Sequence, residues 1–283
     1  MNIDKGRSFM AMDNDYDESE IVVFGIPYDG TTSYRPGTRF GPMHVRNESE
    51  GIETYSPYFD MDLEDYMIHD AGDLYFPLGD VNATMKIIEE YSDSLISDNK
   101  IPMMIGGEHL VTLPVVKSVF KKYENMHIVH LDAHADVRDD YMGQPLSHAT
   151  VIRRVSDFIK PCNIHQFGIR SGERSEFKWA KTNTNFNPFS LEGIKKLKEQ
   201  LGDQPVYITI DLDVLDPSIF PGTGTPEPGG ATYKELQKAI VTLSELNIVG
   251  ADIVELSPHY DHSGTSTAVA CKTLRELIFA ILR

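Results

Sequence analysis

Residues 128–136 read Ile-Val-His-Leu-Asp-Ala-His-Ala-Asp, a short apolar run that ends in acidic and imidazole side chains. A run this short and rich in Ile and Val is typical of a strand that is buried on both faces of a parallel sheet. Side chains two residues apart in an extended segment point to one side, so Asp132, His134 and Asp136 are expected to share one face. The stretch therefore predicts both a buried strand and a polar cluster at its end.

Apolar runs of this kind recur along the chain, and helical patterns separate them. With the run just described, the expected strands are residues 21–26, 101–105, 128–131, 164–169, 206–210 and 248–256. Apolar residues three and four apart predict helices at residues 81–96, 110–123, 147–159, 191–201, 232–246 and 273–282. This alternation predicts an α/β fold with a parallel central sheet, whose site lies beyond the carboxyl ends of the strands.

The domain organisation follows from length and local composition. A chain of 283 residues fits one large α/β domain, and no linker, repeat or low-complexity tract divides it. Residues 13–20 are an acidic run that reads as a solvated segment. We therefore expect residues 1–20 to form an acidic N-terminal arm and residues 21–283 to form a single catalytic domain.

The composition limits the partners and the compartment. A formal net charge of −17 argues against nucleic acid or an anionic membrane surface as a partner, because both are polyanions. It suits a cationic substrate, although acidic side chains also serve solubility. The apolar runs are far shorter than a membrane span, and the N-terminus lacks the apolar segment of a signal peptide. Cys162 and Cys271 offer no disulfide framework, which indicates reduced thiols and a cytoplasmic location.

Acidic and imidazole side chains follow three of the expected strands. Taken singly, each group has a structural alternative, namely a polar loop, a helix cap or a buried histidine. Together they supply four Asp and two His, and four carboxylates neutralise two divalent cations far better than one. The candidate metal ligands are His109, Asp132, His134, Asp136, Asp211 and Asp213. These hard donors favour Mn²⁺, with Fe, Co, Ni and Zn left open, and two adjacent cations activate water for hydrolysis.

The motifs resemble those of the arginase/agmatinase (ureohydrolase) family over nearly the whole chain, and bacterial agmatinases most of all. The matching segments are residues 25–30, 35–42, 106–109, 132–136 and 211–217, followed by Glu255. The resemblance implies a three-layer α/β/α fold, two Mn²⁺ per chain, and a homo-oligomer that is a trimer or a hexamer. In this family one metal would be held by His109, Asp132, Asp136 and Asp211, and the other by His134, Asp132, Asp211 and Asp213.

The resemblance also implies catalytic roles for Asp136, His148 and Glu255, with Glu255 and His148 contacting the guanidinium substrate. A carboxylate at the end of an apolar strand needs a cationic partner, and a guanidinium offers a bidentate one to Glu255. The alternative is a structural ion pair with one of the chain's own arginines. His148 opens an amphipathic stretch, where it could titrate near neutrality and move protons, or simply lie on the surface or cap a helix.

The implied reaction is hydrolysis of a small cationic guanidine, with agmatine cleaved to putrescine and urea as the first choice. Residues 137–147 lack the Asn/Ser-rich pattern by which arginases hold an α-carboxylate and an α-amine. Asp139 or Asp140 could receive the distal ammonium of agmatine, or both could be solvated loop charges. Arg138 could instead favour guanidinobutyrate. An arginase-type ureohydrolase, a non-hydrolytic metal-binding homologue and a metal-dependent deacetylase are the remaining alternatives.

Overall fold

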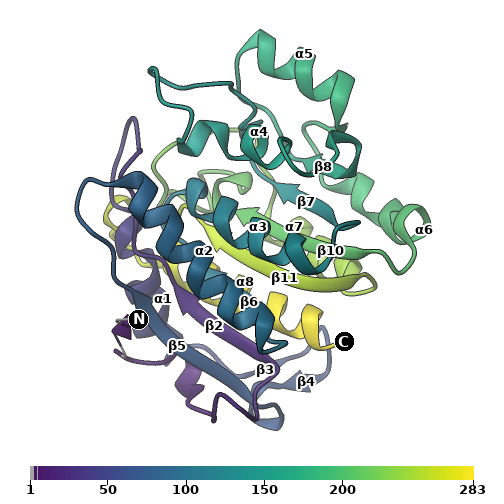
Figure 1. Ribbon diagram of the computed structural model, residues 1–283. Helices are drawn as coiled ribbons and strands as arrows, with labels where there is room; N and C mark the ends of the chain where they lie inside the picture. The colour runs from purple at the N-terminus through teal and green to yellow at the C-terminus, as the bar shows by residue number, and fades with distance from the viewer. Residues whose placement is uncertain (1–2, 5) are drawn as a thin grey trace.

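The computed structural model describes residues 3–4 and 6–283, which form a nine-stranded sheet and a small two-stranded hairpin (Figure 1). The large sheet has the order β1-β5-β2-β6-β11-β10-β7-β8-β9, and only the pairing of β1 with β5 is antiparallel within the described residues. Its strands are β1 (Ile3–Asp4), β2 (Ile21–Gly25), β5 (Ile68–Leu74), β6 (Ile101–Ile105), β7 (His127–Leu131), β8 (Ile164–Phe167), β9 (Asn185–Asn187), β10 (Pro205–Asp211) and β11 (Asn247–Val254). The hairpin joins β3 (Tyr55–Ser56) to β4 (Met61–Asp62). All six strands that the sequence predicts are present.

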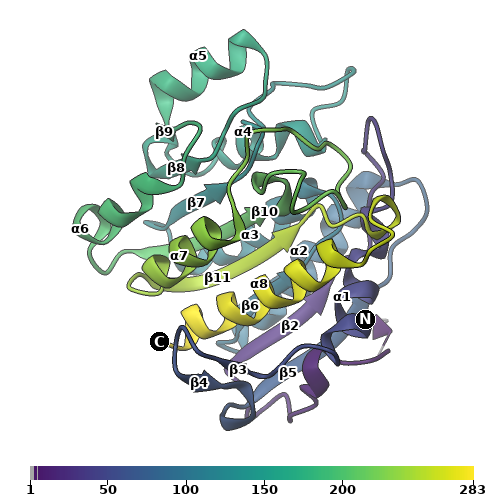
Figure 2. The ribbon, with the colours of Figure 1, turned by 180° about the vertical axis from the view of Figure 1, so that it is seen from behind.

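Helices cover both faces of the sheet, which confirms the three-layer α/β/α fold. On the face toward the viewer in Figure 1 lie α2 (Val81–Ser97), α3 (Thr112–Lys122), α4 (Val151–Val155) and α5 (Arg174–Asn183). On the face shown in Figure 2 lie α1 (Gly41–Ser49), α6 (Leu197–Leu201), α7 (Tyr233–Leu243) and α8 (Thr265–Leu282). Among the described residues, no helix has both the length and the apolar character needed to cross a bilayer.

The strands supply apolar side chains to both helical layers in alternation. In β2, Val22 and Phe24 belong to the core on the α2 and α3 side, whereas Ile21 and Val23 belong to the core on the α1 and α8 side. This period of two is the reason that a continuous apolar run forms a doubly covered strand. The sheet is therefore a rigid platform whose strand ends hold the polar residues in fixed positions.

Helix boundaries follow local signals where those signals are strong. Thr232 caps α7 by accepting a hydrogen bond from the backbone N–H of Glu235 at 3.2 Å, and the Glu235 carboxylate accepts one from the backbone N–H of Thr232 at 2.7 Å. This capping box confirms the predicted start of that helix. The last helix begins at Thr265, eight residues before the expected start at residue 273.

Several elements carry no apolar pattern and were not predicted, namely β5, β9, α1 and α5. Strand β5 contains two aspartates, Asp70 and Asp73, which pair with Arg46 of α1 inside the protein. The N-terminal segment is packed on the same side, because Phe9 is fully buried and its backbone N–H donates to Asp70 at 2.7 Å. The acidic residues at positions 13, 15, 17, 18 and 20 are all exposed.

Candidate metal centre and active site

The six candidate ligands lie together beyond the carboxyl ends of β6, β7 and β10. His109 opens a short 3-10 turn after β6 (His109–Val111), and Asp132 directly follows β7. Asp211 is the last residue of β10, and Asp213 lies in the 3-10 turn that follows it. Parallel strands deliver their carboxyl ends to one edge, so residues more than 100 positions apart in the sequence meet there.

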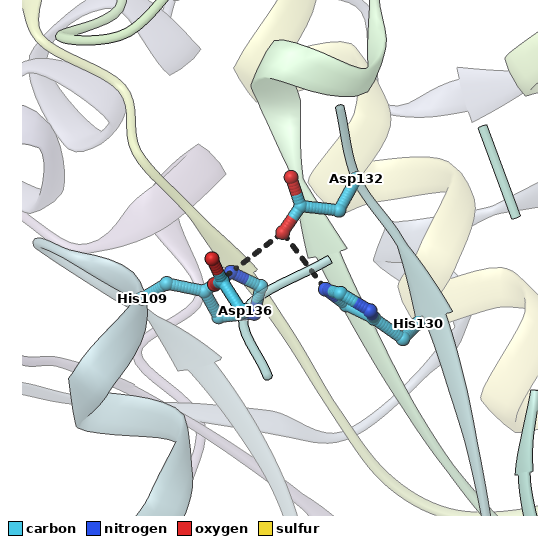
Figure 3. A group of neighbouring side chains, drawn as sticks. All are labelled: His109, His130, Asp132 and Asp136. Carbon is cyan, nitrogen blue, oxygen red and sulfur yellow. Dashed lines mark hydrogen bonds and ion pairs between the residues drawn. The ribbon is translucent and has the colours of Figure 1, made fainter. Parts of the chain in front are cut away.

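The first cluster surrounds Nδ1 of His109, which faces three carboxylates, of which Figure 3 shows those of Asp132 and Asp136. Its distances are 3.1 Å to Asp132 Oδ2, 3.3 Å to Asp211 Oδ2 and 3.4 Å to Asp136 Oδ2. This nitrogen is buried and has no hydrogen-bond partner among the described residues. A buried ring nitrogen surrounded by carboxylate oxygens is a donor arrangement for a cation.

The other nitrogen of His109 shows which way the ring is protonated. Nε2 lies 2.9 Å from the hydroxyl of Thr209, which donates its single proton to Asp252 Oδ1 at 2.6 Å. The hydroxyl therefore accepts from Nε2–H, which leaves Nδ1 of the neutral imidazole with a lone pair toward the carboxylates. Burial opposes protonation of His109, but its contacts to Asp132 and Asp211 raise its pKa well above the usual value, so a proton or a metal cation between these groups relieves their repulsion. Asp252 is thus a buried residue that orients a ligand, and sequence analysis did not identify it.

The second cluster shares Asp132 with the first. Nδ1 of His134 lies 3.0 Å from Asp213 Oδ2 and 3.5 Å from Asp132 Oδ1. Candidate ligand atoms of Asp132, His134 and Asp213 lie within 4.8 Å of one another. The two oxygens of Asp132 therefore face different imidazoles, as expected for a carboxylate that bridges two cations.

His130 supports this bridging carboxylate. Its Nδ1 accepts a hydrogen bond from the Gln166 amide at 3.1 Å, so its Nε2–H donates to Asp132 Oδ2 at 2.8 Å. Gln166 is oriented in turn by the carbonyl of Ala135, to which its amide donates at 2.8 Å. His130 is fully buried, and its hydrogen bond fixes the orientation of the Asp132 carboxylate.

The charges in the cluster perturb one another. Burial, followed by the neighbouring charge of Asp132, raises the pKa of Asp136 well above its usual range. Burial and Asp213 do the same to the pKa of Asp211. Burial opposes ionisation of Asp132 too, but contacts to the surrounding histidines hold its pKa well below the usual range. Divalent cations stabilise all these carboxylates in the charged form, and the oxygen-rich donor set fits them.

Glu255 directly follows β11 and lines the same cavity. Burial and the nearby Glu108 carboxylate raise its pKa to about 8. Its backbone φ of 66° and that of Asp136, 54°, both lie in the left-handed region, which disfavours residues other than glycine. Both residues line the same cavity, and strained backbone positions of this kind occur at active sites.

The cavity has a volume of about 350 Å³. It is lined by Ser33, His109, His134, Asp136, Arg138, Tyr141, His148, Ala149, Ser171, Gly172, Glu173, Glu176, Asp211, Thr225 and Glu255. His148 thus lies where the sequence predicted it, on the wall of the cavity. Burial and the histidines of the cluster lower its pKa to about 4, so the ring is neutral at pH 7. This corrects the expectation that His148 titrates near neutrality.

Asp139 and Asp140 do not reach the cavity, so their predicted contact with the substrate is wrong in this geometry. Both are exposed. Asp139 Oδ1 accepts a 2.7 Å hydrogen bond from Arg153, and Asp140 Oδ1 accepts one from the backbone N–H of Gly143 at 3.0 Å. They line an outer hollow instead. The alternative, that both are charges of a surface loop, describes them better.

Two other carboxylates, Glu173 and Glu176, take the place on the cavity wall that was expected for the loop aspartates. They flank the start of α5, directly after the polar residues that end β8. Arg138 donates to Glu176 Oε2 at 3.1 Å and lies 3.5 Å from Glu173 Oε1. Their position after a strand end was visible in the sequence, but the helix that presents them carries no strong apolar pattern.

Comparison with known proteins extends these findings. A model of the arginase family matches residues 19–280. The agmatinase of Bacillus subtilis strain 168 is 47% identical over 282 residues, covering 98% of this chain and 97% of that protein. The guanidinobutyrase of Pseudomonas aeruginosa strain PAO1 is 33% identical over 276 residues, covering 93% of this chain and 86% of that protein. A crystal structure from Clostridium difficile has a TM-score of 0.93 at 49% identity and covers 94% of this chain and 98% of its own.

Proposed function

The chain belongs to the arginase family, and from that premise we propose that it hydrolyses agmatine to putrescine and urea. One observation carries the proposal: the candidate metal ligands and the buried carboxylate of Glu255 lie in the same cavity. The similarity to a Bacillus subtilis agmatinase over nearly the full length supports the same reaction.

We propose two Mn²⁺ ions as the cofactor. His109, Asp132, Asp136 and Asp211 would hold one ion, and His134, Asp132, Asp211 and Asp213 would hold the other. When bound, such a pair of ions supplies a water made acidic enough to act as a nucleophile at neutral pH. The predominance of oxygen donors around two imidazoles favours Mn²⁺ over ions that prefer thiolates.

The residues of the chain orient the substrate and move the proton. The Glu255 carboxylate pairs with the guanidinium and holds its carbon toward the cluster, where the water oxygen forms a bond to it. Asp136 accepts the proton that the water loses and delivers it to the nitrogen of the departing amine as the C–N bond breaks. Urea and putrescine are the two products. His148, which is neutral at pH 7, lies at the cavity wall, where its Nε2 is 3.3 Å from the Ser33 hydroxyl.

Negative charge at the outer part of the cavity favours a substrate with two cationic ends. Glu173 and Glu176 offer carboxylates to the distal ammonium of agmatine. Arg138 is already paired with both of them, so it is not free for a substrate carboxylate. Guanidinobutyrate is the second candidate, because Arg138 does line the cavity and a relative is named guanidinobutyrase. Its binding would require Arg138 to leave its partners.

Two further properties are part of the proposal. The family resemblance supports a homo-oligomer, a trimer or a hexamer, which analytical ultracentrifugation would measure. Cys162 and Cys271 are unpaired, which supports a cytoplasmic location.

The deciding experiment is urea release from the Mn²⁺-loaded protein, with agmatine, guanidinobutyrate and arginine assayed side by side. We expect a strong preference for agmatine and loss of urea release after chelation. A preference for guanidinobutyrate would support the proposed hydrolysis of a guanidine but would show that agmatine is not the preferred substrate. No urea from any of the three would favour a non-hydrolytic homologue or a deacetylase, and assay of an acetylated amine would then separate these two.

A further inference from the structure

A buried carboxylate beside the metal cluster has no part in the mechanism above. Glu108 is fully buried, and its oxygens accept hydrogen bonds from the loop that follows β2. Oε2 accepts hydrogen bonds from the backbone N–H of Thr31 at 2.8 Å and from the Thr32 hydroxyl at 3.2 Å. Oε1 accepts one from the Thr31 hydroxyl at 2.5 Å. Three hydrogen bonds to one buried carboxylate fix this loop against the end of β6.

Thr31 is also the residue that contacts His148. The Thr31 hydroxyl gives its proton to Glu108 and accepts one from the backbone N–H of His148 at 3.1 Å. The Thr31 carbonyl lies 3.1 Å from His148 Nδ1. Because a carbonyl can only accept, Nδ1 must carry the proton. The neutral ring then has its lone pair on Nε2, which lies 3.3 Å from the Ser33 hydroxyl at the cavity wall.

We propose that Thr31, anchored by Glu108, is a positioning residue that holds His148 in the Nδ1–H tautomer with the Nε2 lone pair toward the cavity. The proposal rests on the ureohydrolase function, since it names what prepares His148 for that reaction. In this arrangement His148 accepts a hydrogen bond or a proton from the substrate side through Nε2. In the other tautomer Nε2 would carry the proton. It would then be a donor facing a substrate whose guanidinium and ammonium groups are also donors, so no hydrogen bond could form between them.

The tautomer itself can be measured without turnover. The protein is labelled with ¹⁵N-histidine and loaded with diamagnetic Mg²⁺, and the His148 signals are identified by their loss in His148→Ala. We expect long-range ¹H–¹⁵N spectra to show Nδ1 protonated and Nε2 unprotonated. Protonation at Nε2 in the wild-type protein would overturn the proposal, whether or not the protein releases urea.

Turnover tests the positioning role through a double-mutant cycle. Thr31→Val removes the hydroxyl at nearly constant shape, and we expect kcat to fall about tenfold with KM little changed, because the acceptor is misplaced rather than lost. Thr31→Ser should restore most of the loss. Thr32→Val, which removes one hydrogen bond to Glu108 but none to His148, should lose less. Metal content and thermal midpoint are measured for each variant.

The decisive comparison places Thr31→Val in a His148→Ala background. If Thr31 acts through His148, the second substitution should cost less than about twofold there, because coupled residues are not additive. A loss of the same factor in both backgrounds would show a merely structural role and overturn the proposal. Failure of the wild-type protein to release urea would count against the ureohydrolase function instead, and the spectra would still decide the tautomer.

Discussion

The backbone N–H of His109 donates a 2.7 Å hydrogen bond to Oε1 of Glu255. This bond joins the end of β6 to the end of β11, and it ties a candidate metal ligand to the candidate guanidinium carboxylate. A backbone N–H and a side-chain oxygen therefore hold these two residues in contact, and the backbone N–H of Glu255 donates in turn to the Gly107 carbonyl at 2.9 Å. Such placement gives the fixed geometry that attack on a bound carbon requires.

Glu255→Gln separates the two functions of this side chain. The amide oxygen still accepts from the backbone N–H of His109, but the charge that pairs with a guanidinium is lost. We expect kcat/KM for agmatine to fall by about a hundredfold or more, since one partner of a buried charge pair is removed. Metal content and thermal midpoint should stay near those of the wild-type protein. Activity at the wild-type level would exclude Glu255 as the guanidinium partner.

Asp132→Ala removes the carboxylate that both clusters share. We expect bound Mn²⁺ to fall below two ions per chain and kcat to fall by at least about a thousandfold, because neither ion keeps its full donor set. Metal analysis after dialysis and urea release measure the two effects. Asp140→Ala, which removes an exposed carboxylate outside the cavity, is the matched control and should change neither. Two bound ions with full turnover in Asp132→Ala would refute the ligand assignment.

Glu173→Gln tests the recognition of the distal ammonium. The Glu173 side chain is 62% exposed, so its charge is partly screened and its contribution is modest. We expect KM for agmatine to rise about threefold to fivefold with kcat nearly constant. Glu124→Gln, an exposed position at the amino end of β7, serves as the control. An unchanged KM would mean that the distal ammonium is bound elsewhere.

Arg46→Ala tests the buried ion-pair network between α1 and β5. Arg46 binds Asp70 through two 2.8 Å hydrogen bonds and also pairs with Asp73. Removing the guanidinium leaves buried carboxylates without a partner, which should lower the free energy of unfolding by about 3–5 kcal/mol. Arg7→Ala breaks an exposed pair with Glu50 and should cost less than about 1 kcal/mol. Urea unfolding compares the two, and equal losses would contradict the buried network's role.

His165→Gln tests a pH dependence of stability at the opposite edge of the sheet. Burial, and then His127 at 3.0 Å, lowers the pKa of His165 to about 4. The unfolded chain therefore binds the proton more readily, and stability is lost as the pH falls from about 6.5 toward 4, by roughly 3 kcal/mol in all. Between pH 7 and pH 5 the wild-type protein should lose about 2 kcal/mol more than the variant. Equal losses in urea unfolding would show that His165 is not the responsible group.

The features that sequence predicted are those with a local signal. Apolar runs predicted the six central strands, and the polar residues directly after them predicted where the candidate metal ligands gather, because a strand end fixes both position and direction. Strand β5 was missed because its aspartates are neutralised by Arg46, a residue more than 20 positions away. The loop aspartates were misplaced for the same kind of reason. Asp139 forms an ion pair with Arg153. The packing of α5 decides which carboxylates face the cavity, and the sequence does not show that packing.

Strand β11 is the last strand of the chain, yet it lies in the middle of the sheet between β6 and β10. The ribosome therefore releases His109 and Asp132 long before it releases the strand that must be inserted between them. Until residues 247–254 have been synthesised, β6 and β10 lack the strand that pairs with both of them in the native sheet. The residues proposed for the second ion lie at the ends of β7 and β10, which pair directly, whereas His109 joins them only once β11 lies between β6 and β10.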